Sequence, residues 1–335
     1  MMPRRSLRLP IVVLVLVFSV ALSACGSSSS SSSTTGSSAN AASTGGSSTS
    51  GSAAPSGGSS GTSGKFLVVA AENFWGSIAT QLAGDKAVVR SIIVNPDTDP
   101  HDYNPTASDG RLVAQSKLAI VNGLGYDKWA SQSLAANPSS GRVVLNVGDL
   151  LGLKDGDNPH RWYFPTDVYR VVDQIVADYD KLDPGDAAYF AQQKQTFETQ
   201  GLAQYNQLRK EIRTKYAGVP VGYSESIFQG LGADLGLQLM TPYSFAKAIS
   251  EGTEVTAADK RTVSSQAQNR LIKVWVYNSQ NVTPEIAAVT RIVKAQHIPI
   301  ATVTETLAPA SDDFEQWQVA QLRGLLAALH RATGH

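Results

Sequence analysis

Two histidines in this chain stand in matching loop contexts. His101 follows Pro100 and His160 follows Pro159, each between an expected strand and an expected helix. Loops at such boundaries lie outside the strand ends, where α/β proteins bind their ligands. A single loop histidine is usually only solvated, but two in the same context indicate a shared site. Because imidazole is the commonest metal ligand among side chains, that site is expected to bind a metal ion.

Two glutamates offer the matching oxygen ligands. Glu225 and Glu305 each come directly after an expected strand, at the edge of a sheet where ligands gather. Glu225 could instead be a charge that favours a helix N-terminus, and Glu305 could lie on a solvated loop. Imidazole with carboxylate suits manganese, iron or zinc. The only cysteine is Cys25, which excludes a thiolate metal site and a disulfide framework.

The elements that position these residues alternate between apolar, β-rich runs and helical patterns. Strands are expected at 66–70, 87–94, 118–122, 142–147, 219–223, 238–241, 272–277 and 298–303, with helices between them. Ser108 and Thr166 are candidate helix caps. One helix of unusual length is predicted from Asp183 to about Tyr216. The pattern predicts an α/β fold with two Rossmann-like lobes, each with a parallel sheet, joined by one long connecting helix.

The N-terminal segment predicts export and lipid attachment. Three arginines precede an apolar run from Leu9 to Leu22, and Leu22-Ser23-Ala24-Cys25 then resembles the lipobox of bacterial lipoproteins. The apolar run is too short for a spanning helix. From Gly26 to Gly64 the chain is almost wholly Ser, Gly, Thr and Ala, which is typical of a disordered tether.

The expected organisation follows from these segments. It is a signal peptide over 1–24, the lipidated cysteine and tether over 25–64, an N-terminal lobe over 65–182, the connecting helix over 183–217, and a C-terminal lobe over 218–335. The 28 basic and 28 acidic residues balance, so nothing favours binding to nucleic acid.

Several segments together resemble a known family. Asp99-Pro100-His101-Asp102-Tyr103-Asn104-Pro105-Thr106 looks like the Asp-Pro-His segment of the zinc/manganese solute-binding lipoproteins of metal ABC importers (ZnuA/TroA-like). Asn158-Pro159-His160-Arg161-Trp162 resembles their second Pro-His motif, and Ala71-Glu72-Asn73-Phe74-Trp75-Gly76 matches the segment after their first strand. The resemblance covers essentially all of residues 65–335.

The resemblance implies a binding protein rather than an enzyme. Members of this family hold a metal ion between two lobes, and the matching positions are His101, His160, Glu225 and Glu305. The sequence of this chain departs from the family's pattern at two positions. Many relatives carry aspartate where Glu305 stands, and an aspartate is usual in place of Asn158.

The implied function is capture of a divalent transition metal, manganese or zinc, outside the cytoplasm and its delivery to an ABC permease. The carboxylate-rich ligand set favours manganese, which accepts about six ligands more readily than zinc does. Lipid on Cys25 would anchor a monomer to the bacterial cell membrane. The alternatives are a surface adhesin or organic-solute-binding lipoprotein on the same scaffold, and an extracytoplasmic metallohydrolase. The hydrolase is disfavoured because the chain has no His-Glu-x-x-His motif and no Gly-x-Ser-x-Gly motif.

Overall fold

The computed structural model describes residues 64–334, which belong to one compact unit. The predicted signal peptide, the lipidation site Cys25 and the tether lie outside the described residues. Among residues 64–334, no helix is both long enough and apolar enough to cross a membrane.

The N-terminal lobe is built on a four-stranded parallel sheet. Its strands are β1 (Phe66–Glu72), β2 (Ala87–Ile93), β3 (Leu118–Val121) and β4 (Val143–Asn146), in the order β2-β1-β3-β4. The central strands β1 and β3 are apolar and buried along most of their length, as expected for a sheet covered on both faces. Their carboxyl ends therefore meet at one edge of the lobe.

Helices cover both faces of this sheet. They are α1 (Asn73–Ala83), α2 (Ala107–Gln115), α3 (Lys128–Ala136), α4 (Val147–Leu151) and α5 (Pro165–Leu182). Two predicted caps are wrong. Thr106, not Ser108, caps α2, because its hydroxyl accepts from the Asp109 backbone while the Asp109 carboxylate accepts in return. Helix α5 begins at Pro165, whose fixed φ suits the first helical position, so Thr166 lies inside the helix.

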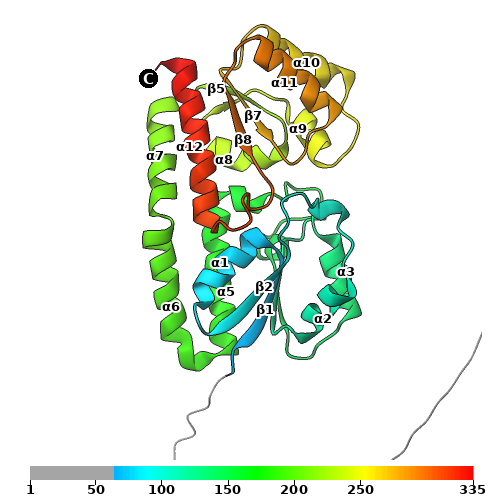
Figure 1. Ribbon diagram of the computed structural model, residues 1–335, viewed down its shortest axis with the longest axis vertical. Helices are drawn as coiled ribbons and strands as arrows, with labels where there is room; N and C mark the ends of the chain where they lie inside the picture. Colours follow the sequence, from blue (N-terminus) through cyan, green and yellow to red (C-terminus); the bar gives the residue numbers. More distant parts are fainter. Residues whose placement is uncertain (1–63, 335) are drawn as a thin grey trace, which may run out of the picture. The chain divides into compact units, whose positions relative to one another are not determined.

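The connecting helix is present but is not uniformly α-helical. It consists of α6 (Ala187–Thr196), a π-helical segment (Phe197–Gly201) and α7 (Ala203–Tyr216). Figure 1 shows α6 beside α5 and α7 beside the final helix α12 (Phe314–Thr333). The first half of the connecting helix therefore packs against the N-terminal lobe, and the second half packs against the C-terminal lobe. The sequence predicted the length of this helix but not its π-helical segment.

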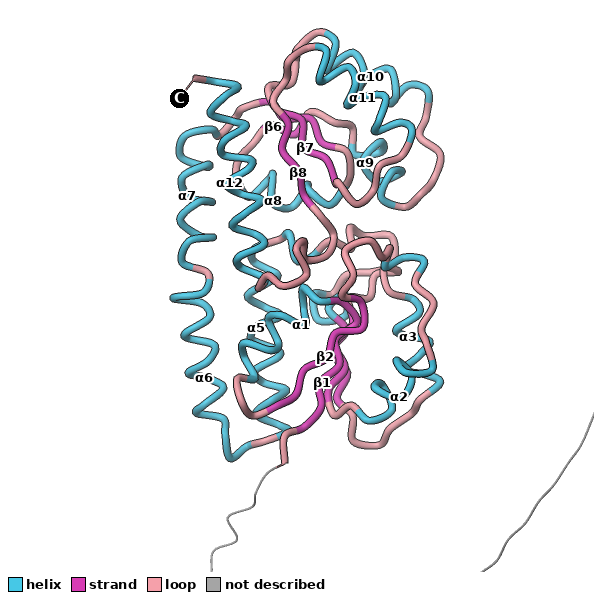
Figure 2. The backbone as a smooth tube through the Cα atoms, viewed as in Figure 1, coloured by secondary structure: helices cyan, strands magenta, loops and turns pink. Residues whose placement is uncertain are grey.

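The C-terminal lobe repeats the arrangement of the first. Its strands are β5 (Pro220–Tyr223), β6 (Gln238–Leu239), β7 (Val274–Asn278) and β8 (Ile300–Val303), all parallel and in the order β6-β5-β7-β8. Figure 2 shows the strands of the two lobes as two separate groups. Its helices are α8 (Gln229–Asp234), α9 (Tyr243–Ser250), α10 (Ala257–Gln268), α11 (Pro284–Ala295) and α12. The predicted α/β fold with two parallel-sheet lobes and a connecting helix is confirmed.

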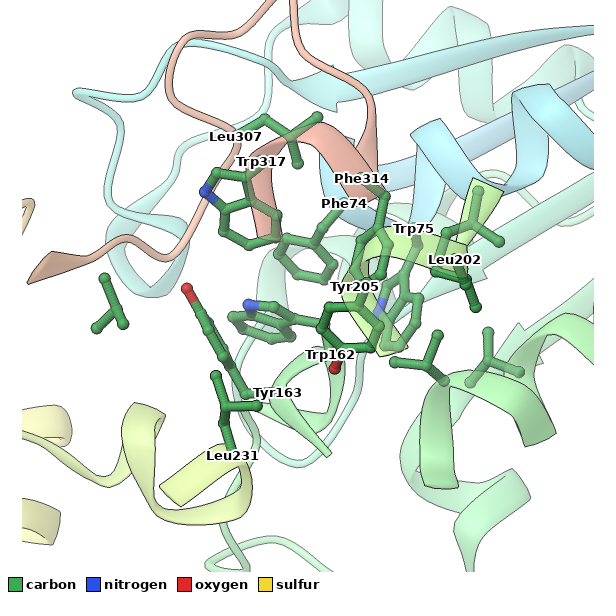
Figure 3. Packing of buried hydrophobic residues seen from close by; sticks show 14 of the residues in the cluster. Phe74, Trp75, Trp162, Tyr163, Leu202, Tyr205, Leu231, Leu307, Phe314 and Trp317 are labelled. Atoms are coloured by element: carbon green, nitrogen blue, oxygen red, sulfur yellow. The ribbon is translucent and has the colours of Figure 1, made fainter. Parts of the chain in front are cut away.

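One apolar core crosses the boundary between the lobes. Figure 3 shows aromatic side chains from both lobes packed together, among them Phe74 and Trp162 from the first and Trp317 from the second. The rings of Phe74 and Trp162 stack with centroids 3.8 Å apart. The hydroxyl of Tyr163 donates to the backbone oxygen of Thr304 at 2.8 Å, across the same boundary. This shared core fixes the strand ends of the two sheets with respect to each other.

Candidate metal centre

His160 is buried and oriented by a neighbouring amide. Its Nδ1 lies 2.9 Å from Oδ1 of Asn158, whose Nδ2 donates to the backbone oxygen of Ser226 at 2.7 Å. Because that amide nitrogen faces a carbonyl, Oδ1 faces the ring and Nδ1 carries the proton. The lone pair then lies on Nε2, which is buried and has no hydrogen-bond partner. Burial lowers the pKa of His160 well below its ordinary value, and the charge of His101 acts in the same direction, so the ring is neutral.

His101 stands in a short 3₁₀ turn, Pro100–Asp102, after β2. The carboxylate of Asp99 accepts from the His101 backbone nitrogen at 2.9 Å and caps that turn. The imidazole packs edge-on against Tyr126, with ring centroids 4.6 Å apart. Asp99 thus orients the backbone of His101 rather than its ring.

Glu305 follows β8 and is held on both carboxylate oxygens. Its Oε2 accepts from the Tyr126 hydroxyl at 2.8 Å, and its Oε1 accepts from Asn278 Nδ2 at 3.1 Å. The backbone nitrogen of Glu305 donates to Gln280 Oε1 at 2.7 Å. Burial raises the pKa of Glu305, while His101 and the Tyr126 hydrogen bond offset part of the rise.

The structure brings three of the four predicted residues into one cluster. His101, His160 and Glu305 each offer one ligand atom, and these atoms lie within 4.8 Å of one another. Ligands at about 2.1 Å from one ion lie at most about 4.2 Å apart, so a small contraction closes the cluster on an ion. The residues come from different lobes, two from the first and one from the second.

Glu225 lies next to this cluster but is not part of it. It precedes the 3₁₀ turn Ser226–Phe228 and is fully buried. Its Oε2 lies 3.5 Å from the Nδ2 of Asn278, and its Oε1 has no hydrogen-bond partner. Burial raises the pKa of Glu225 well above its ordinary value, and the negative charge of Glu305 raises it further. Asn278 therefore stands between the two carboxylates.

Two cavities are each lined by one residue of the cluster. One of about 320 Å³ lies between the lobes and is lined by His101, Asn158 and Ser226 among others. A smaller one of about 80 Å³ is lined by Asp97, Asp99 and Glu305 among others. His101 and Glu305 thus border open space, whereas His160 is buried and lines neither cavity.

Comparison with known proteins assigns the fold to a family. A model of the ZnuA family, described as zinc-uptake complex component A, periplasmic, matches residues 68–328. The chain belongs to this family. The ZnuA-family match covers both lobes and all four of the residues discussed above.

The curated relatives of this ZnuA-family chain carry names of metal-binding proteins. It is 27% identical over 190 residues to the iron-binding protein YfeA of Yersinia pestis, which covers 53% of the chain and 60% of YfeA. It is 27% identical over 178 residues to the manganese-binding lipoprotein MntA of Halalkalibacterium halodurans, covering 50% of the chain and 57% of MntA. The alignments thus span less than two thirds of these relatives' length.

Solved structures show the same fold. The periplasmic zinc-binding protein TroA of Treponema pallidum superposes with a TM-score of 0.65 at 18% identity, covering 80% of this chain and 99% of TroA. A manganese-bound periplasmic metal-binding protein (S38A mutant) from Candidatus Liberibacter asiaticus gives a TM-score of 0.68 at 19% identity, covering 79% of this chain and all of the other.

Three residues of the site were not predicted to contribute. Tyr126 and Asn278 hold Glu305, and Asn158 orients His160. The sequence singled out Asn158 only as a departure from the family's usual aspartate. The contacts of Tyr126 and Asn278 with Glu305 could not be assigned from the sequence, because each residue meets Glu305 only through the tertiary fold.

Proposed function

We propose that this protein captures one divalent transition-metal ion between its lobes and delivers it to the permease of an ABC importer. The proposed ligands are His101, His160 and Glu305, with Glu225 joining them as the fourth. The observation that carries the proposal is that ligand atoms of His101, His160 and Glu305 lie within 4.8 Å of one another, and that two buried atoms of the proposed ligands, Nε2 of His160 and Oε1 of Glu225, have no hydrogen-bond partner. Buried polar atoms are rarely unpaired, and a cation would pair both.

The proposed cargo is manganese, with zinc as the second candidate. Two neutral imidazoles and two carboxylates balance the charge of a divalent ion. Carboxylate oxygens suit manganese better than they suit copper or nickel. Relatives are named for iron and manganese, and the solved neighbours are described with manganese, cadmium or zinc. Because intrinsic affinity favours zinc over manganese at most sites, both ions are expected to bind in vitro.

The proposed location is the outer side of a bacterial membrane. The lipobox-like segment ending at Cys25 supports a lipid anchor, and several relatives are named as lipoproteins of metal ABC transporters. In this proposal the monomer searches for its permease on a tether. An enzymatic role is not proposed, because four protein ligands would close the position that a catalytic water needs.

Calorimetric titration tests the proposal. The metal-stripped protein is titrated with Mn(II) and with Zn(II), and each is expected to bind one ion per chain. His160→Ala is expected to weaken binding at least about tenfold, the loss typical of disturbed metal centres. His297→Asn is the matched control, since His297 lies at an exposed position with φ of 54° that asparagine also accepts.

Two results would contradict the proposal. If neither ion binds, the adhesin or organic-solute alternative stands. If His160→Ala and His297→Asn bind equally well, the ion lies elsewhere on the protein.

A further inference from the structure

The loop that carries Glu305 is held by side-chain amides. The backbone nitrogens of residues 304–307 all donate to amide oxygens of asparagine or glutamine. The pairs are Thr304 with Gln321 at 2.9 Å, Glu305 and Thr306 with Gln280 at 2.7 and 3.1 Å, and Leu307 with Asn73 at 3.3 Å. An amide oxygen accepts a hydrogen bond without bringing a charge to the site. Of these three amides, Gln280 alone accepts from two of the nitrogens.

Gln280 holds Glu305 at its backbone. It lies two residues after the end of β7, and its Oε1 accepts from the nitrogens on both sides of the Glu305 Cα atom. Its Nε2 donates to the hydroxyl of Thr306 at 3.1 Å, which fixes the orientation of the amide. Because Oε1 already accepts from two donors, Gln280 is not itself a ligand of the ion. It fixes the point from which the Glu305 side chain starts.

Gln280 also orients the carboxylate of Glu305, by way of Asn278. The backbone nitrogen of Gln280 donates to Oδ1 of Asn278 at 2.9 Å, so this amide presents its Nδ2 to the carboxylate. That Nδ2 donates to Oε1 of Glu305, while the Tyr126 hydroxyl donates to Oε2. Glu305 is therefore held at its backbone and at both carboxylate oxygens, which opposes its movement toward an ion.

A carboxylate held in this way distinguishes ions by their coordination geometry. Zinc is usually tetrahedral with bonds of about 2.1 Å, which places every pair of its ligand atoms about 3.4 Å apart. Manganese accepts about six ligands, so some pairs of ligand atoms lie twice a bond length apart and water can complete the shell. At separations of up to 4.8 Å, the ligand atoms of His101, His160 and Glu305 must move inward further for a tetrahedral ion than for a six-coordinate one.

We propose that Gln280 determines the specificity of the site: by restraining Glu305, it opposes the inward movement that zinc requires and raises the affinity for manganese relative to zinc. This inference rests on the function proposed above. Gln280 acts through Glu305 and does not touch the ion, so it is a positioning residue. Without the restraint, Glu305 can follow a tetrahedral ion, whereas manganese loses a carboxylate that was already in place.

The ratio of the dissociation constants for Mn(II) and Zn(II) tests the inference. Both ions are titrated into the full chain, metal-stripped, and then competed against each other. Gln280→Met keeps the length of the side chain and removes the amide. It is expected to weaken Mn(II) binding about tenfold and Zn(II) binding less than about threefold, so that the ratio shifts toward zinc. A general loss of stability would weaken both ions alike and would cancel in the ratio.

Hydrogen exchange of the metal-free protein shows whether the restraint itself is lost. The amide hydrogens of Glu305 and Thr306 are expected to exchange faster in Gln280→Met than in the wild type, because their acceptor is gone. Gln280→Glu keeps an acceptor oxygen for both nitrogens and is expected to restore the slow exchange and the wild-type ratio. Its added negative charge attracts both divalent ions and therefore also cancels in the ratio.

Gln266→Met is the matched control. Gln266 is a buried glutamine of the same lobe, on α10; its Nε2 donates to the backbone oxygen of Met240 at 2.7 Å, and its Oε1 has no hydrogen-bond partner. This substitution removes a hydrogen bond between a glutamine and the backbone without touching the loop that carries Glu305. It is expected to leave the ratio of the dissociation constants and the exchange of Glu305 and Thr306 unchanged.

The outcomes separate this inference from the proposed function. An unchanged ratio in folded Gln280→Met overturns the inference, even if both ions bind more weakly. Thermal unfolding shows whether each variant is folded before metal is added. If Gln280→Met does not fold, Gln280→Asn replaces it under the same criterion, because its shorter side chain draws the oxygen away from the two nitrogens. If the wild type binds neither ion, the proposed function itself fails.

Discussion

Replacing Tyr126 by phenylalanine isolates one hydrogen bond of the proposed metal centre. The Tyr126 hydroxyl is buried and donates to Glu305 Oε2 at 2.8 Å. Burial and the charge of Glu305 raise the pKa of Tyr126 well above its ordinary value, so the phenol stays a donor throughout the accessible pH range. Phenylalanine keeps the ring that packs on His101 and removes only the donor.

The expected magnitude follows from the charge of the acceptor. A hydrogen bond to a charged group contributes about 1.5–3 kcal/mol, and removing the donor leaves a buried carboxylate oxygen underpaired. Since about 1.4 kcal/mol corresponds to a factor of ten, Tyr126→Phe should weaken metal binding roughly 10- to 100-fold. The loss arises because Glu305 is no longer held in the orientation that binds the ion.

Calorimetric titration with Mn(II) and Zn(II) measures the effect. Tyr205→Phe is the matched control, because the Tyr205 hydroxyl is also buried but has no hydrogen-bond partner, and the residue lies on α7. This control should bind metal as the wild type does. Equal or tighter binding by Tyr126→Phe would refute the reasoning, since it would mean that the hydroxyl competes with the ion for Glu305.

Two further predictions concern the other groups of the site. Asn158→Ala removes the acceptor that fixes the proton of His160 on Nδ1, so metal affinity should fall about 10- to 100-fold in the same titration; a change below twofold would contradict this role. The pKa values of Glu225 and Glu305 are raised, so each proton must leave before its oxygens bind metal. A carboxyl group with a raised pKa in the folded state contributes stability that is lost as pH rises through that pKa, and bound metal restores it. The rise in melting temperature caused by metal should therefore grow with pH, and thermal unfolding that showed a pH-independent rise would count against both assignments.

The strands could be predicted from sequence because burial on both faces demands continuous apolar runs. Each predicted strand overlaps an observed one, and the ends differ by only a few residues. The start of α2 was predicted wrongly because two cap-forming residues, Thr106 and Ser108, stand close together. The start of α5 was predicted wrongly because Pro165 itself takes the first helical position. Only the folded backbone shows that Thr106 rather than Ser108 pairs with Asp109.

Some residues of the candidate metal centre could be predicted from the sequence and others could not. His101 and Glu305 lie in the loops that follow β2 and β8, whereas helix α4 stands between β4 and His160. The three residues come from loops of two different sheets, and the structure brings their ligand atoms together. Tyr126 could not be predicted, because its partner Glu305 lies 179 residues away.

The shared contact of Asn278 makes the two glutamates one thermodynamic unit. Its single amide nitrogen lies 3.1 Å from Glu305 and 3.5 Å from Glu225. A movement of either carboxylate therefore changes the hydrogen bond that Asn278 donates to the other carboxylate. The free-energy costs of replacing Glu225 and Glu305 should accordingly not add, because the second replacement acts on a site already reorganised by the first. The relevant quantity for this pair is their coupling energy, and an affinity assigned to either glutamate alone has no independent meaning.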